Sequence, residues 1–180
     1  MYDPIENNFI NLGGPQKMDI EITAYDRKYI SETISIWNDV VEDGIAFPQM
    51  DLLTEESGDE FFTQQSFTGL AYDKDSKSIV GLYILHPNNI GRCGHISNTS
   101  YAVKKGLRGH HIGEKLVLHS LSKAKELGFS IMQFNAVVKT NENALHLYEK
   151  LGFVKLGIIP KGFLMKDGTY EDIVPHYRLL

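Results

Sequence analysis

The stretch 106–117, GLRGHHIGEKLV, places two histidines between glycines, with an arginine just before them and the apolar spacing of a helix just after. Three kinds of chemistry could use it: a metal site, a phosphate-binding loop, or the start of a helix. Adjacent histidines point in different directions, and no cysteine or carboxylate stands beside them at a ligand spacing. We therefore expect no metal here.

The spacing also excludes two common phosphate-binding motifs. A Walker loop needs Lys and then Ser or Thr directly after its second glycine, but Gly113 is followed by Glu114. A dinucleotide fingerprint needs G-x-G-x-x-G, which is not present. What remains is a basic loop before a helix N-terminus, where unpaired N–H groups and the positive end of the helix dipole favour a pyrophosphate.

A second motif, NENALHLYEKLGF, follows about 30 residues later at 141–153. Together the two motifs resemble the GNAT superfamily of acyl-CoA-dependent N-acyltransferases, whose loop carries Q/R-x-x-G-x-G/A and whose later helix carries N-x-x-A-x-x-x-Y-x-x-x-G-F. The first pattern is met by Arg108 and Gly113, while His111 stands at the middle glycine. That departure raises the question of whether the backbone there needs a positive φ. The second pattern is met in full by Asn141, Ala144, Tyr148, Gly152 and Phe153.

The resemblance implies that acetyl-CoA binds between the strand ending at Val103 and the strand around Phe134, with no metal. Backbone groups of the first strand would pair with the pantetheine arm, one N–H would polarise the thioester carbonyl, and Lys104 or Lys105 would meet the 3′-phosphate. Asn141 would bind the arm or only cap its helix. The expected acetyl-CoA-binding residues are Tyr101, Ala102, Val103, Arg108, Gly109, His110, His111, Ile112, Gly113, Glu114, Asn141, Ala144 and Tyr148.

Two residues are candidates for proton transfer. Tyr148 matches the position from which a phenol would protonate the leaving thiolate, unless it only fills the core. The strand before the loop has no carboxylate, so His95 is its candidate base, acting through water, unless a structural hydrogen bond occupies it. Direct attack needs no covalent intermediate, so Cys93 is expected to pack rather than react.

The acceptor is expected at Asn98, Asn135 and Phe47. Each asparagine interrupts a strand that should be buried, so each needs a hydrogen-bonding partner, either a ligand or a structural network. Phe47 lies in a segment, 39–62, with eight acidic residues and no Lys or Arg. This segment would form the opposite wall, and its charge suits a cationic amine.

The expected function is therefore transfer of an acetyl group to a small-molecule amine such as an amino acid or analogue. Two alternatives stay open: acetylation of a protein N-terminus or lysine, and a non-catalytic acyl-CoA sensor. A homodimer formed through the closing strands is an expectation from the family.

We expect one α+β domain over residues 18–180 to position these residues, after a polar arm at 1–17. The resemblance implies a mixed, mostly antiparallel sheet of six or seven strands with a splayed central pair and about four helices. Apolar spacing predicts helices over 27–44, 58–67, 112–127 and 141–152. It predicts strands over 18–25, 68–75, 77–87, 94–103, 130–138, 153–160 and 170–180.

Bulk properties exclude several classes of protein. The 180 residues carry a net charge of −5, which disfavours nucleic acid as a partner. No apolar run approaches the roughly 20 residues that span a bilayer, so we expect no membrane partner. The first residues lack the pattern of a signal peptide, and there is one cysteine, so we expect a cytoplasmic protein.

Overall fold

A computed structural model describes residues 18–107 and 109–180. The arm expected at 1–17 lies outside the described residues. The described helices are η1 (Arg27–Tyr29), α1 (Ile30–Asp43), α2 (Glu55–Thr63), η2 (Gly91–Cys93), α3 (Ile112–Glu126) and α4 (Glu142–Lys150). The described strands are β1 (Ile20–Ala24), β2 (Phe67–Asp73), β3 (Ser78–Pro87), β4 (Ile96–Val103), β5 (Ile131–Phe134), β6 (Val154–Lys155), β7 (Ile159–Leu164), β8 (Tyr170–Ile173) and β9 (His176–Leu179).

Seven of these strands form one mixed sheet in the order β1-β2-β3-β4-β5-β9-β6. Every neighbouring pair is antiparallel except β4 and β5, and β7 and β8 form a separate two-stranded sheet. Four α-helices lie among the described residues. The expected α+β architecture is therefore confirmed.

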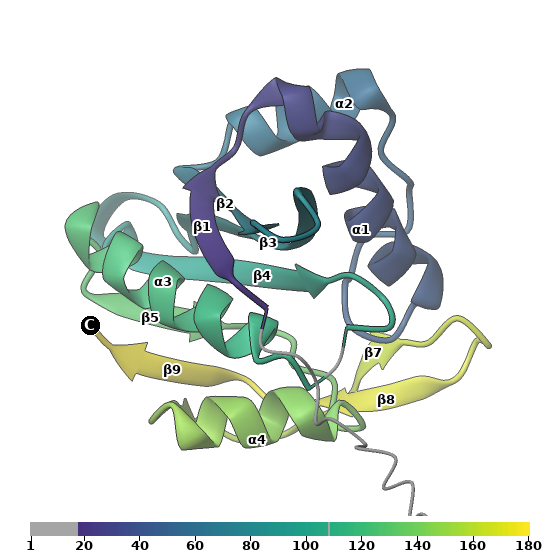
Figure 1. Cartoon of the computed structure of the whole chain (residues 1–180). Coiled ribbons are helices and arrows are strands. Elements are labelled where there is room, and N and C mark those ends of the chain that lie inside the picture. The colour runs from purple at the N-terminus through teal and green to yellow at the C-terminus, as the bar shows by residue number, and fades with distance from the viewer. Residues whose placement is uncertain (1–17, 108) are drawn as a thin grey trace, which may run out of the picture.

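The helices cover the two faces of the sheet (Figure 1). One apolar cluster joins α1 and α2 to one face around Trp37 and Phe62. The other joins α3 and α4 to the opposite face around Leu116 and Phe134. Burial of these side chains is the main force that fixes α3 and α4 against the central strands.

The central pair β4–β5 is splayed, as expected. The two strands pair only at Ile96–Ile131 and Ser97–Met132, after which they separate. The strand predicted over 130–138 is correspondingly too long, because β5 ends at Phe134. Residues 135–138 leave β4 and line the space between the two strands.

The closing strands also differ from the prediction. The segment 170–180 splits into β8 and β9, which belong to different sheets, on either side of Val174 and Pro175. Proline has no N–H to donate to a ladder, so the strand is interrupted there. The segment 153–160 likewise contributes β6 to the large sheet and only the beginning of β7 to the small one.

Helix α2 begins three residues earlier than predicted. The Thr54 hydroxyl accepts a hydrogen bond from the Ser57 N–H at 3.2 Å, and the Ser57 hydroxyl accepts one from the Thr54 N–H at 3.0 Å. This capping box uses serine where glutamate or glutamine is usual, so the sequence signal is weaker.

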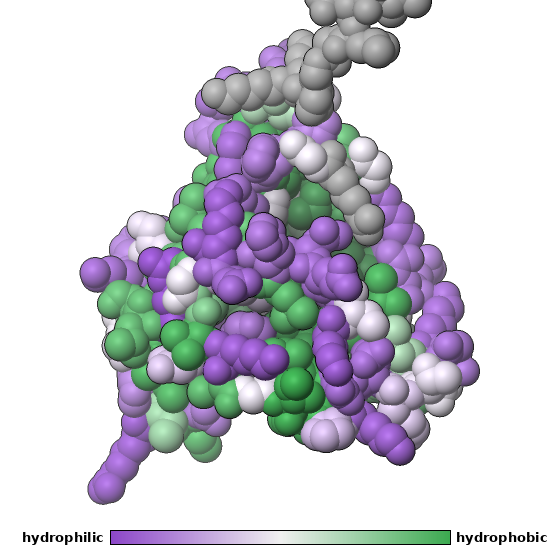
Figure 2. All heavy atoms as spheres, turned by 90° about the horizontal axis from the view of Figure 1, so that it is seen from below, coloured by the Kyte–Doolittle hydropathy of each residue, from purple (hydrophilic) through white to green (hydrophobic). Residues whose placement is uncertain are grey.

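The surface is chemically mixed. Seen from below the view of Figure 1, hydrophobic residues appear in groups between hydrophilic ones (Figure 2). In the part of the chain that the structure describes, no helix combines the length and apolarity needed to cross a bilayer.

Candidate active site

Two adjoining cavities open where β4 and β5 separate. The larger has a volume of about 1140 Å³ and lies among the ends of α1 and β4, the loop 104–111, and the starts of α3 and α4. The smaller has a volume of about 200 Å³ and lies between β4 and the segment 134–138. Both are lined by Ala46, Tyr101 and Asn141.

The splay frees one backbone edge of β4. The Lys104 N–H donates to the Val80 carbonyl at 2.9 Å at the end of the β3–β4 ladder. Because hydrogen-bonded residues alternate along an antiparallel pair, the backbone groups of Ala102 also face β3. The expectation that the backbone of Ala102 pairs with the pantetheine arm is therefore wrong, although this residue lines the larger cavity. The backbone groups directed toward the cleft belong to Thr99, Tyr101 and Val103.

The glycine-bracketed stretch forms the loop before α3. His111 is the N-cap of α3 and adopts the left-handed conformation, with φ 57° and ψ 21°. Its imidazole is 74% exposed and lies 3.2 Å from the Glu114 carboxylate, so the ring is not needed to fill the loop. The residue at the family's middle glycine position thus has the backbone conformation that glycine favours. Arg108 lies outside the described residues.

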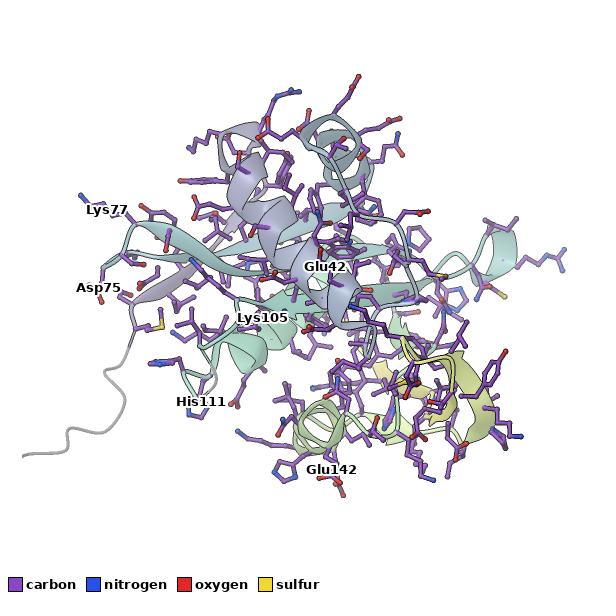
Figure 3. The ribbon with its side chains drawn as sticks, turned by 90° about the vertical axis from the view of Figure 1, so that its right-hand side faces the viewer. Glu42, Asp75, Lys77, Lys105, His111 and Glu142 are labelled. Carbon is purple, nitrogen blue, oxygen red and sulfur yellow. The ribbon has the colours of Figure 1, made fainter. Side chains whose placement is uncertain are left out.

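Charged side chains surround this loop. Lys105 forms an ion pair with Asp43 of α1 at 2.9 Å, and Glu114 forms one with Lys150 of α4 at 2.7 Å. The Lys150 ammonium, and then His111, hold the pKa of Glu114 below its usual range. Figure 3 labels Lys105 and His111, which both belong to the loop before α3. His110 lines neither cavity, contrary to expectation.

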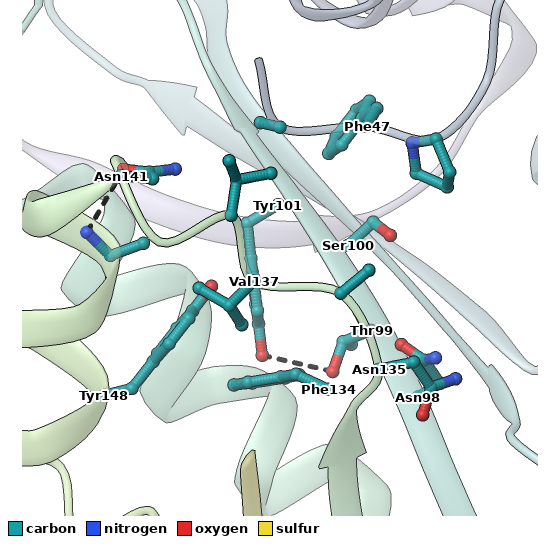
Figure 4. Close-up of a pocket in the computed structure, with 15 residues that line it drawn as sticks. Phe47, Asn98, Thr99, Ser100, Tyr101, Phe134, Asn135, Val137, Asn141 and Tyr148 are labelled. Atoms are coloured by element: carbon teal, nitrogen blue, oxygen red, sulfur yellow. Dashed lines mark hydrogen bonds between the residues drawn. The ribbon is translucent and has the colours of Figure 1, made fainter. Parts of the chain in front are cut away.

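Tyr148 projects from α4 into the smaller cavity (Figure 4). Its ring packs against Phe134 with centroids 4.4 Å apart. Burial raises the pKa of Tyr148 above its usual range. Within residues 18–107 and 109–180, no hydrogen-bond partner contacts its hydroxyl. By contrast, the Tyr101 hydroxyl is bonded to Ser120 at 2.7 Å, and burial raises its pKa to about 12.

Asn141 lies between the two cavities at the start of α4. Its side-chain oxygen accepts a hydrogen bond from the Ala144 N–H at 3.3 Å and so caps the helix. Ala144 lines the smaller cavity only. Capping and contact with the cavities are therefore compatible roles for Asn141.

The other end of the smaller cavity is formed by amides. Asn98 and Asn135 both donate to the side-chain oxygen of Asn88, at 3.2 and 2.6 Å. Asn88 was not predicted from the sequence. It follows β3 directly, and its pairing with Ile96 would have placed it beside the start of β4. Asn135 is exposed rather than buried, because the strand ends before it.

The wall opposite these amides is uncharged. Phe47 packs against Trp37 with ring centroids 4.4 Å apart, and it lines the smaller cavity together with Ala46 and Pro48. The acidic wall expected there is therefore wrong. Asp43 is the only acidic residue of the segment 39–62 that lines either cavity, and it faces the larger one.

His95 is not part of the site. It is exposed and precedes β4, where that strand still pairs with β5, whereas the cavities begin only after the strands separate. His95 was expected within this strand, but it lies just before it, at the end away from the cavities. The described residues contain no group of three or more His, Cys, Asp or Glu side chains placed to hold a metal.

Comparison with known proteins agrees with this geometry. The model of the acetyltransferase (GNAT) family matches residues 34–153. The chain is 33% identical over 103 residues to the N-acetyltransferase aca1 of Schizosaccharomyces pombe, covering 56% of this chain and 49% of that protein. It spans half or less of the length of the curated relatives it matches.

Solved structures share the fold. A GCN5-related N-acetyltransferase from Kribbella flavida superimposes with a TM-score of 0.82 at 26% identity, covering 89% of this chain and 98% of that one. A phosphinothricin acetyltransferase from Sinorhizobium meliloti gives a TM-score of 0.83 at 18% identity, covering 91% and 89%. With both loop and helix motifs placed at one cleft and the family model matching most of the chain, the protein belongs to the GNAT family of acetyltransferases.

Proposed function

We propose that the protein transfers an acetyl group from acetyl-CoA to the amine of a small molecule by direct attack in a ternary complex. The observation that carries this proposal is the free backbone edge of β4, which runs from the loop before α3 to the hydroxyl of Tyr148. The small volume of the acceptor cavity supports a small-molecule acceptor over an extended peptide.

The larger cavity has the features that acetyl-CoA requires. The N-terminus of α3 offers backbone N–H groups to the pyrophosphate, and Lys104 and Lys105 offer positive charge to the 3′-phosphate. The edge of β4 pairs with the pantetheine arm as an added strand would. The S. meliloti neighbour was determined in complex with AcCoA, which supports this donor.

The transfer needs one bond formed and one broken. The neutral amine nitrogen attacks the thioester carbon, whose oxygen accepts a hydrogen bond from a backbone N–H of the free β4 edge. As the C–S bond breaks, the Tyr148 hydroxyl gives its proton to the departing sulfur. The proton lost by the nitrogen returns to Tyr148 through solvent, so amine and thioester become amide and thiol with no net gain or loss of protons.

Calorimetric titration with acetyl-CoA tests the donor assignment, with desulfo-CoA and dephospho-CoA as comparison ligands. We expect micromolar binding that weakens when the 3′-phosphate is missing. Release of free CoA thiol across a panel of small amines then tests transfer. Binding without thiol release would support the sensor alternative, and no binding would reject the donor.

A further inference from the structure

The smaller cavity is lined only by uncharged side chains. None of its fifteen lining residues, all within the described part of the chain, carries a carboxylate, an ammonium, a guanidinium or an imidazole. The two titratable groups are Tyr101 and Tyr148, both of which stay protonated at neutral pH. The lining therefore supplies neither a base for the amine nor a counter-ion for a charged acceptor.

The other described titratable groups near the smaller cavity do not contribute to its lining. His86 of β3 lies opposite Asn98 in the ladder, but its Nδ1 is 2.9 Å from the carbonyl of Pro87. His176 of β9 lies behind the Tyr148 ring, at a centroid distance of 6.1 Å, and its Nδ1 is 2.7 Å from the Val174 carbonyl. From α1, Asp43 faces the larger cavity, where it is paired with Lys105.

We propose that the acceptor is a small, weakly basic amine of the α-amino amide class, which enters as the free base and places its uncharged amide against Asn98 and Asn135. This inference rests on the proposed function and specifies its substrate class. It replaces the amino acid expected from the sequence, because a carboxylate would find no positive partner among the lining residues.

The absence of a base in the lining makes the basicity of the acceptor decisive. An α-amino group with a pKa of about 7.7–8.0 is neutral in roughly one molecule in eight at pH 7. An alkylamine with the pKa of a lysine side chain, about 10.4, is neutral in roughly one in 2500. Ionisation alone thus favours the weaker base by about 300-fold at pH 7.

The amides at the end of the cavity offer both a donor and an acceptor. Each Nδ2 group uses one hydrogen toward Asn88, which leaves the second hydrogen for a ligand carbonyl. The Asn135 oxygen accepts from Gln133 at 2.9 Å, whereas the Asn98 oxygen has no partner among the described residues. A primary amide, which has one carbonyl and two N–H donors, complements this arrangement.

The first experiment compares glycinamide, glycine and propylamine by thiol release across pH 6 to 10. We expect glycinamide to have the largest kcat/KM, at least tenfold above glycine when both values are calculated for the concentration of neutral amine. The acidic limb should level off above about pH 8 for glycinamide but still be rising at pH 10 for propylamine, whose pKa is about 2.5 units higher. A limb at the same pH for both acceptors, or a preference for glycine, would overturn the inference.

A pair of variants tests the amide end directly. Asn98→Asp adds a carboxylate to the cavity, and we expect it to lower kcat/KM for glycinamide at least tenfold while improving that for 1,3-diaminopropane. Asn89→Asp adds the same charge at an exposed neighbouring position outside the cavity lining, and it should change neither. Equal effects of the two variants would contradict a contact at Asn98.

Failure of this inference is distinguishable from failure of the proposed function. If acetyl-CoA binds but no amine releases thiol, the transfer activity is rejected and the inference falls with it. If amines react but charged acceptors are preferred, or the acidic limb is fixed, the activity stands and only the acceptor class is rejected.

Discussion

At the scale of single residues, the hydroxyl of Tyr148 differs from the other buried phenols in facing the smaller cavity without a described partner. We predict that Tyr148→Phe lowers kcat by about 10²- to 10⁴-fold, the usual contribution of a positioned acid. The dissociation constant of acetyl-CoA should stay within about twofold, because the ring remains. Steady-state thiol release and calorimetry measure the two quantities.

Tyr83→Phe serves as the control for Tyr148→Phe. The Tyr83 hydroxyl is bonded to His119 at 2.8 Å, and Tyr83 lines neither cavity, although its ring centroid lies 6.1 Å from that of Tyr101. Its loss should lower the free energy of unfolding by roughly 1 kcal/mol and leave kcat nearly unchanged. Comparable losses of kcat in both variants would assign Tyr148 a structural role.

Variants of His111 test whether its backbone conformation or its imidazole ring supports the binding of acetyl-CoA at this loop. Because its φ is 57°, His111→Gly should relieve about 1 kcal/mol of backbone strain and keep or improve the affinity for acetyl-CoA. His111→Ala removes the ring but keeps the strain, so it separates the two effects. Calorimetry measures both variants, and a loss above tenfold in the glycine variant would show that the imidazole contacts the ligand.

Residue types and spacing predicted most of the candidate site. Described residues of the two motifs, together with Asn98 and Asn135, line two adjoining cavities, although they lie far apart in sequence. The errors concern position along and across β4, since His95 lies just before this strand and the backbone groups of Ala102 face β3. Those properties depend on which partner strand each residue faces, and one sequence does not encode that pairing locally.

At the scale of elements, α3 lies unusually close to the sheet at Gly81. A Cβ at this position would lie 2.9 Å from the Ala102 carbonyl oxygen and 3.1 Å from side-chain atoms of Ile112 and Leu116. Gly81→Ala should therefore push the N-terminal turn of α3 away from β3 and β4.

We predict for Gly81→Ala a loss of about 1–3 kcal/mol in the free energy of unfolding, as for other overpacked cores. The affinity for acetyl-CoA should fall as well, because the displaced turn provides the pyrophosphate site. Urea denaturation and calorimetry measure these changes. Gly168→Ala, at a turn glycine with φ 84° and no atom near its Cβ position, destabilises through backbone strain without overpacking, so it should lower the free energy of unfolding and leave the affinity for acetyl-CoA unchanged.

Helices were predictable where spacing and end signals agreed. Gly44 and Gly128 both adopt positive φ at the ends of α1 and α3, the conformation that glycine favours after the last helical turn. The segment 130–138 was misjudged because Val137 and Val138 are buried without belonging to a strand. Apolar composition reports burial, but it does not tell a ladder from an irregular segment that lines a cavity.

At the scale of the whole molecule, two histidines set the response to acid, of which His119 is half-buried and His176 is buried. Burial lowers the pKa of His119 and of His176 below the usual value of 6.5. The unfolded chain therefore binds protons before the folded protein does. The free energy of unfolding should be constant above about pH 7 and fall below pH 6.5, by at most about 1.4 kcal/mol per pH unit for each histidine.

Urea denaturation at pH 7.5, 6.5 and 5.5 measures this slope. The double variant His119→Gln/His176→Gln should flatten it in this window. Carboxylates such as Asp73 and Asp172, whose pKa values are lowered by hydrogen bonds from Ser76 and Lys139, lose their contribution only below about pH 4. An equal slope in the double variant would show that other groups take up the protons.

The position of β9 has a consequence for synthesis on the ribosome. β9 pairs with β5 on the side away from β4, and it follows β5 by about 45 residues. At roughly 5–20 residues per second, the nascent β5 waits about 2–9 s for this neighbour. During that interval it is held to β4 by only two residue pairs and presents an open edge to other chains. The divergence that opens the two cavities thus leaves the second edge of β5 exposed until β9 has been synthesised.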